Sequence, residues 1–127
     1  MFDHIGIAVA DFATSHDFYA RALAALGLQK LVEFPKDDGG AVAGFGAQGK
    51  PFFWLATNDK PKGGLHIAFA AESRAEVDEF YNAAIAAGAR DNGAPGLRPH
   101  YHEHYYGAFV LDPDGNNIEA VCHKAAD

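Results

Sequence analysis

The sequence repeats itself at an offset of 62 residues. The dipeptide His4-Ile5 recurs as His66-Ile67, and Phe18-Tyr19 recurs as Phe80-Tyr81, with both matches at the same offset and no gap between them. Alanines also match at this offset, but alanine is common in this chain and these matches carry little weight. A repeat of this length indicates two copies of one supersecondary unit that share a core.

The length of 127 residues is that of one domain with a sizeable core. The repeat divides this domain into two modules, about 1–58 and 65–127, with a turn-rich linker between them at 58–64. Each module opens with a histidine, so any chemistry carried by one histidine is expected to involve the other.

Composition excludes several classes of partner. The chain has 10 Lys and Arg against 17 Asp and Glu, a formal charge of -7, and its basic residues are scattered, which disfavours nucleic acid. It has no apolar run of the length that a membrane span needs and no secretory signal at its N-terminus, so we expect a cytoplasmic protein without a membrane partner. The single cysteine, Cys122, is expected to be a small buried hydrophobe.

Residues 2–10 alternate in character and predict a strand. One face of this strand carries bulky side chains and the other carries a histidine and two very small residues, namely Ile5, Ile7 and Val9 against His4, Gly6 and Ala8. The small residues leave space in front of the imidazole, as in the floor of a pocket. The strand that opens the second module divides in the same way.

Apolar stripes at helical spacing predict one helix in each module. The first begins at Asp11 or Thr14 and runs to about Leu26. The second begins with Ser73 and Glu76, which have the spacing of a capping box. Further strands are expected at 28–34, 41–47, 52–57, near 89–92, at 107–111 and at 117–123, with an irregular Gly/Pro segment at 93–99.

Alternation along the last strand places Glu119, Val121 and His123 on the face opposite Ile118, Ala120 and Cys122. If the two modules pair about a pseudo-twofold axis, His4, His66 and Glu119 converge in one cavity. Two imidazoles and one carboxylate suit a divalent first-row metal and leave positions open for water or substrate. The alternative interpretation is that each histidine is only hydrogen-bonded or half-exposed and that Glu119 faces solvent.

The paired histidines, the paired Phe-Tyr stripes and the segment Asp112-Pro113-Asp114-Gly115-Asn116-Asn117-Ile118-Glu119 resemble the vicinal oxygen chelate superfamily. That superfamily includes glyoxalase I, extradiol dioxygenases, fosfomycin-resistance enzymes and bleomycin-resistance proteins. The resemblance implies an α+β fold of two βαβββ modules, with curved mixed sheets around a central cavity and helices on the outer face. It also implies that His4, His66 and Glu119 bind a divalent metal ion such as Fe, Mn, Ni or Zn.

Two departures from the family patterns bear on the reaction. Glyoxalase I takes a fourth ligand, a Glu, from the last strand of its first module, where this chain has Trp54 and offers no carboxylate from 52 to 56. The extradiol dioxygenases carry a His and then an apolar-Tyr pair ahead of the Asp-Pro turn. Here that pair is Ala108-Phe109, and His100 or His102 is the candidate for the histidine.

The run from His100 to Tyr106 holds three histidines and three tyrosines. We expect it to border the mouth of the cavity, with His100 and His102 as protonatable groups and His104 and Tyr105 against substrate. Phe52 and Trp54 would add an apolar wall. A second metal site in this run is an alternative.

These features predict a metal-dependent enzyme whose metal chelates neighbouring oxygens of a small substrate, in a reaction of the lyase, isomerase or dioxygenase type. The alternative is a small-molecule binding protein of the bleomycin-resistance kind, without catalysis. The open sheet edges expected at 2–10 and 65–70 favour a homodimer.

Overall fold

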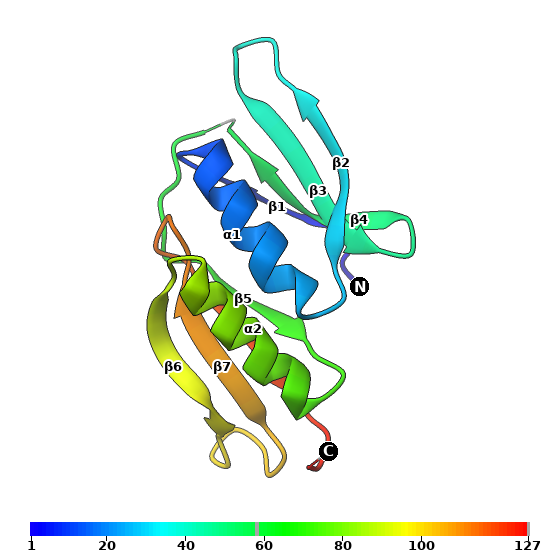
Figure 1. Ribbon diagram of the computed structural model, residues 1–127, viewed down its shortest axis with the longest axis vertical. Helices are drawn as coiled ribbons and strands as arrows, with labels where there is room; N and C mark the ends of the chain where they lie inside the picture. The colour runs from blue at the N-terminus through cyan, green and yellow to red at the C-terminus, as the bar shows by residue number, and fades with distance from the viewer. Residues whose placement is uncertain (58, 127) are drawn as a thin grey trace.

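The computed structural model describes residues 1–57 and 59–126. Asn58, which ends the first predicted module, and Asp127 lie outside the described residues. Each half of the chain contributes a strand, a helix and three further strands (Figure 1). The elements are β1 (Ile5–Ala8), α1 (Phe12–Ala24), β2 (Gln29–Pro35), β3 (Ala41–Ala47), β4 (Lys50–Ala56), β5 (His66–Ala70), α2 (Arg74–Ala86), β6 (Arg90–Leu97), β7 (Tyr106–Leu111) and β8 (Asn117–Cys122).

The strands form two four-stranded mixed sheets of the same topology. The strand order is β1-β4-β3-β2 in the first sheet and β5-β8-β7-β6 in the second. In each sheet the opening strand pairs in parallel with the last strand of its module, and the other pairs are antiparallel. The predicted α+β fold of two βαβββ modules is therefore confirmed, and β1 and β5 are edge strands as expected.

The helices cover one face of the sheets and pack against each other (Figure 1). The buried residues between the helices and the sheets form one continuous core. This core includes Phe18 and Phe53 from the first module and Phe80 and Ile118 from the second. The rings of Phe53 and Phe69 meet edge to face at 5.2 Å and join the two halves of this core. The opposite face of each sheet is left without a helix.

Side chains of the predicted types cap both helices. The Asp11 carboxylate accepts from the Thr14 backbone N–H at 3.2 Å, which decides between the two candidates for the first N-cap. The Ser73 hydroxyl accepts from the Glu76 N–H at 3.2 Å, as the capping box predicted. The Glu76 carboxylate reaches one residue further back than expected and accepts from the Glu72 N–H at 3.1 Å.

Two strand predictions need correction. The first strand is shorter than 2–10, because only Ile5–Ala8 pairs with β4. The segment at 93–99 is not irregular throughout: β6 continues to Leu97 through bulges around Gly93. Pro95 is tolerated because β6 is an edge strand, where one missing donor breaks no ladder. No helix in the described part of the chain is both long and apolar enough to cross a membrane.

Candidate functional site

His66 and Glu119 meet on the open face of the second sheet. Parallel pairing places Asn117 opposite His66 and Glu119 opposite Ala68. The imidazole reaches the carboxylate diagonally across the two strands, and the neighbouring Ala68 has only a methyl group. The distance from His66 Nε2 to Glu119 Oε1 is 2.8 Å. The Glu119 residue is 1% exposed, whereas the His66 side chain keeps 55% of its surface in contact with solvent.

Tyr105 is the second partner of the Glu119 carboxylate. Its hydroxyl donates a hydrogen bond to Glu119 Oε2. Burial of the phenol raises the pKa of Tyr105, and the hydrogen bond to Glu119 raises it further. Each carboxylate oxygen thus has its own partner. We call His66, Tyr105 and Glu119 the Glu119 half-site.

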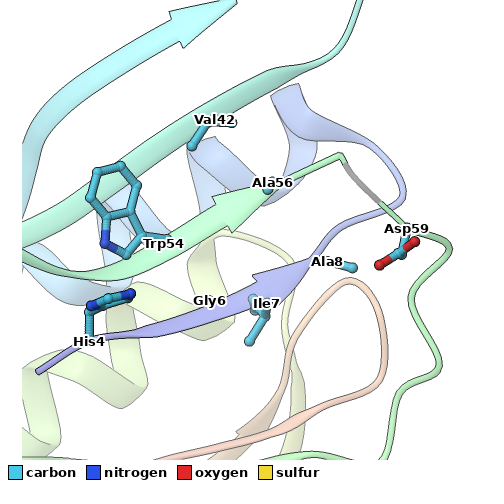
Figure 2. Close-up of a pocket in the computed structure, with 8 residues that line it drawn as sticks. All are labelled: His4, Gly6, Ile7, Ala8, Val42, Trp54, Ala56 and Asp59. Atoms are coloured by element: carbon cyan, nitrogen blue, oxygen red, sulfur yellow. The ribbon is translucent and has the colours of Figure 1, made fainter. Parts of the chain in front are cut away.

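His4 lies on the open face of the first sheet, just before β1 begins. Its Nδ1 lies 2.7 Å from Asp3 Oδ1, an oxygen that also accepts from Lys50 Nζ at 2.9 Å. The hydrogen bond with His4, followed by that with Lys50, lowers the pKa of Asp3. His4 also lines a hollow of about 390 Å³, together with Gly6, Ile7, Ala8, Val42, Trp54, Ala56 and Asp59 (Figure 2).

Trp54 forms one wall of this hollow. In β4 its neighbours Phe53 and Leu55 point into the core, and Trp54 lies on the open face beside His4 (Figure 2). The strand register places it between Gly6 of β1 and Gly44 of β3. A Cβ atom on Gly44 would lie 2.9 Å from Trp54 Cζ3 and 3.0 Å from Pro51 Cβ, so a larger residue at position 44 would have to displace the indole or the proline. We call His4, Gly6, Gly44 and Trp54 the His4 half-site.

The two half-sites are separate within one chain. Among the residues that the structure describes, no three His, Cys, Asp or Glu side chains gather in a group that could hold a metal ion. His66 and Glu119 come together, whereas the nearest ionisable partner of His4 is Asp3. Within one chain His4 therefore lies apart from the pair of His66 and Glu119, each on the open face of its own sheet beside an edge strand.

The run from 100 to 106 is folded into turns instead of being extended. The Tyr105 carbonyl accepts from the Arg98 N–H at 2.7 Å, and the Tyr105 N–H donates to the His102 carbonyl at 3.1 Å. His100 packs its ring on Tyr101 at 4.2 Å, and the His102 ring lies 6.1 Å from that of His104.

Only one side chain of this run bonds to the carboxylate. In the described part of the chain, the side chains that hydrogen-bond to Glu119 are His66 and Tyr105, not His100, His102 or His104. Phe52 lines a second hollow, which shares His4 with the hollow of Trp54 and is also lined by Met1, Phe2, Asp3, Ile5 and Lys50. The sequence predicted that Tyr105 lies near the substrate, but it did not predict the hydrogen bond from Tyr105 to Glu119. This bond depends on how the loop folds, and a folded loop leaves no periodic signal in the sequence.

Comparisons with known proteins agree on the family. The sequence model of the Glyoxalase/Bleomycin resistance protein/Dioxygenase superfamily matches residues 1–120. The crystal structure of a glyoxalase/bleomycin resistance protein from Albidiferax ferrireducens T118 is similar with a TM-score of 0.77 and 30% sequence identity, over 96% of this chain and 98% of that chain. No curated protein matches the sequence.

More distant structures share the fold. A glyoxylase/bleomycin resistance protein/dioxygenase domain from Frankia sp. EAN1pec has a TM-score of 0.74 at 20% identity, over 100% of this chain and 94% of that chain. Glyoxalase I from Zea mays has a TM-score of 0.69 at 23% identity, over 99% of this chain and 45% of that chain.

Proposed function

Because the chain belongs to the Glyoxalase/Bleomycin resistance protein/Dioxygenase superfamily, we propose that it is a metal-dependent enzyme that binds a small substrate through two neighbouring oxygens. The observation that carries this proposal is the Glu119 carboxylate, which is buried beside the Nε2 atom of His66. A carboxylate is rarely buried without a strong partner. Imidazole nitrogen and carboxylate oxygen are donors that first-row divalent ions accept.

The donors of the Glu119 half-site fit such an ion but do not complete its site. His66 and Glu119 supply two donors, and a stable site generally needs a third. His4 is the remaining candidate, and in one chain it lies in the other half-site. We therefore assign the third donor to His4 of a second copy, so that a symmetric dimer forms two equivalent sites.

The surface around His4 supports this pairing. Met1 and Phe2 are fully or largely exposed, Ile5 is partly exposed, and all three line one hollow with Phe52, His4, Asp3 and Lys50, in which apolar surface predominates. Exposed apolar surface of this kind indicates a protein–protein contact. The free edges of β1 and β5 lie next to the half-sites and add backbone groups that a second copy can pair with.

Each side chain then has a distinct task. When bound, the ion supplies Lewis-acid polarisation of the substrate oxygens. His66, Glu119 and His4 of the second copy would hold it in place. Trp54 excludes water from one flank and presents a flat apolar wall to the substrate. Because no carboxylate stands at position 54, these residues would supply three donors and leave room at the ion for a substrate with two neighbouring oxygens.

The apolar wall favours a partly aromatic or apolar substrate, in a reaction of the lyase, isomerase or dioxygenase type. The second candidate is a small-molecule binding protein without catalysis, favoured by the hollow of Val42, Trp54 and Ala56, in which apolar side chains predominate.

Elemental analysis separates the two functions. Purified protein with roughly one Fe, Mn, Ni or Zn ion per chain supports the enzyme. Protein that stays free of metal after refolding with each of these ions, and that binds hydrophobic small molecules all the same, supports the binding protein and overturns the metal site.

A further inference from the structure

We propose that Tyr105 is a positioning residue for Glu119: its hydroxyl occupies Oε2 and leaves only Oε1 to bind the metal. The inference rests on the metal site proposed above and adds how that site keeps room for substrate. It also assigns a role to Tyr105 within the run from 100 to 106. The other aromatic and ionisable side chains of this run do not reach Glu119.

The two oxygens of Glu119 face different parts of the protein. Oε1 lies 2.8 Å from His66 Nε2, on the side where the second ligand stands. Oε2 accepts the hydrogen bond from Tyr105, which belongs to the loop before β7. An ion that bound both oxygens would have to displace the phenol at a carboxylate that is 1% exposed, where water does not readily replace the lost bond.

Gly107 lets the phenol reach the carboxylate. A Cβ atom at this position would lie 3.2 Å from Tyr105 Cε1, so a methyl group would press on the phenol ring, and 3.4 Å from Glu119 Oε2, which is an ordinary contact. Glycine at this position therefore lets the ring lie close to the strand without being pressed aside.

The loop and its neighbours hold the phenol ring in this place. Arg98 donates to the carbonyls of Gly96 and Ala94, each at 2.9 Å, and its backbone N–H donates to the Tyr105 carbonyl. The ring of Tyr105 meets Tyr101 at 5.1 Å and His123 at 5.2 Å, both edge to face. Rotation of the side chain away from Glu119 would break the two ring contacts.

A carboxylate held in this way matters for the chemistry. Carboxylate ligands bind through one oxygen or through both, and a second oxygen takes one more position around the ion. Hydrogen bonds from neighbouring groups decide the orientation of ligands, and their loss typically weakens metal binding by 10-fold to 100-fold. By holding Oε2, Tyr105 keeps a position free for the second oxygen of the substrate.

The test is a titration of the wild-type protein and of Tyr105→Phe with Co²⁺, followed in the visible spectrum. The phenylalanine keeps the ring contacts and removes only the hydroxyl. We expect the dissociation constant to rise by about 10-fold or more. We also expect the spectrum at saturation to weaken, because Glu119 becomes free to bind through both oxygens and the coordination number increases.

Two further variants sharpen the test. Tyr101→Phe removes a phenol hydroxyl from the same loop at a residue that is 61% exposed, and it should leave both the affinity and the spectrum unchanged. Gly107→Ala keeps the Tyr105 hydroxyl but displaces the ring, and it should shift both readouts in the direction of Tyr105→Phe.

The titration distinguishes a failure of the role of Tyr105 from a failure of the metal site. If wild-type protein binds Co²⁺ and Tyr105→Phe matches it in affinity and in saturated spectrum, the positioning role is wrong and the metal site stands. If wild-type protein binds no Co²⁺, the metal site itself is wrong and the role of Tyr105 falls with it. A spectrum that changes equally in Tyr101→Phe would also overturn the assignment to Tyr105.

Discussion

The Tyr19 hydroxyl on α1 donates a hydrogen bond to the Asp112 carboxylate in the turn between β7 and β8. This contact joins one module to the other. Both residues are buried, and the same carboxylate accepts the backbone N–H groups of Asp114 and Asn116, each at 2.9 Å. One carboxylate thus ties α1 to the turn that leads into β8, the strand that carries Glu119.

Tyr19→Phe should destabilise the protein by about 1–3 kcal/mol, because it leaves a buried carboxylate without one donor. Chemical denaturation monitored by circular dichroism measures this loss. The repeat offers a matched control in Tyr81→Phe, since Tyr81 is the equivalent tyrosine and donates to the exposed Asp91 at 3.0 Å. We expect that control to change stability by less than about 0.5 kcal/mol. Equal losses in both variants would contradict the special role of Asp112.

Substitution of either ligand of the Glu119 half-site should abolish tight metal binding. His66→Ala and Glu119→Ala each leave too few donors for a labile ion, and isothermal titration with Zn²⁺ measures the loss. His102→Ala is the matched control, because this histidine lies in the loop near Tyr105 and does not bond to Glu119. The same holds for His100→Ala and His104→Ala. Full metal occupancy in Glu119→Ala would remove Glu119 from the site.

Mixed dimers test whether the site is shared between two copies. His4→Ala and Glu119→Ala chains should each bind metal poorly alone, yet a heterodimer of the two combines an intact His4 with an intact Glu119 at one of its two sites. Random mixing after unfolding and refolding should therefore restore about a quarter of the wild-type metal sites. A monomer in light scattering at micromolar concentration, or a mixture with no recovery, would exclude a shared site.

Most of the fold was predictable from alternation of side chains along strands and from the internal repeat. Alternation in β8 separated the buried Ile118 and Ala120 from the face that carries Glu119, and the repeat fixed the number and order of the elements. The first strand was predicted too long, and β6 was predicted too short because Gly93 and Pro95 resemble a loop. Bulges and an edge position accommodate both residues, and neither feature can be recognised from periodicity.

The candidate site was harder to predict because it depends on contacts between distant segments. Parallel pairing of β5 with β8 made the meeting of His66 and Glu119 foreseeable. The separation of His4 from them follows from how the helices and the Phe53–Phe69 contact join the modules, which the pattern of a single strand does not record. The approach of Tyr105 likewise depends on a folded loop and on Gly107.

Trp54 lies at the position where glyoxalase I is expected to have a fourth metal ligand, a carboxylate. Replacement of Trp54 by a residue with a carboxylate should therefore change the affinity for metal. Its side chain lies on the same face as His4, between two glycines, so a shorter side chain at this position has room to point into the hollow. Trp54→Glu should tighten metal binding, since it adds a donor to the three already proposed. It should also shift the site towards the coordination of glyoxalase I.

The wild-type protein should accordingly have weak or no activity on the hemithioacetal of methylglyoxal and glutathione. Trp54→Ala is the control, because it empties the same space without adding a donor, and it should leave metal affinity close to that of the wild type. Titration of the three proteins with Ni²⁺ or Zn²⁺, together with an assay on the hemithioacetal, checks both expectations. Efficient turnover by the wild type would show that the indole does not replace a required ligand. Equal metal affinity in Trp54→Glu and Trp54→Ala would place residue 54 away from the ion.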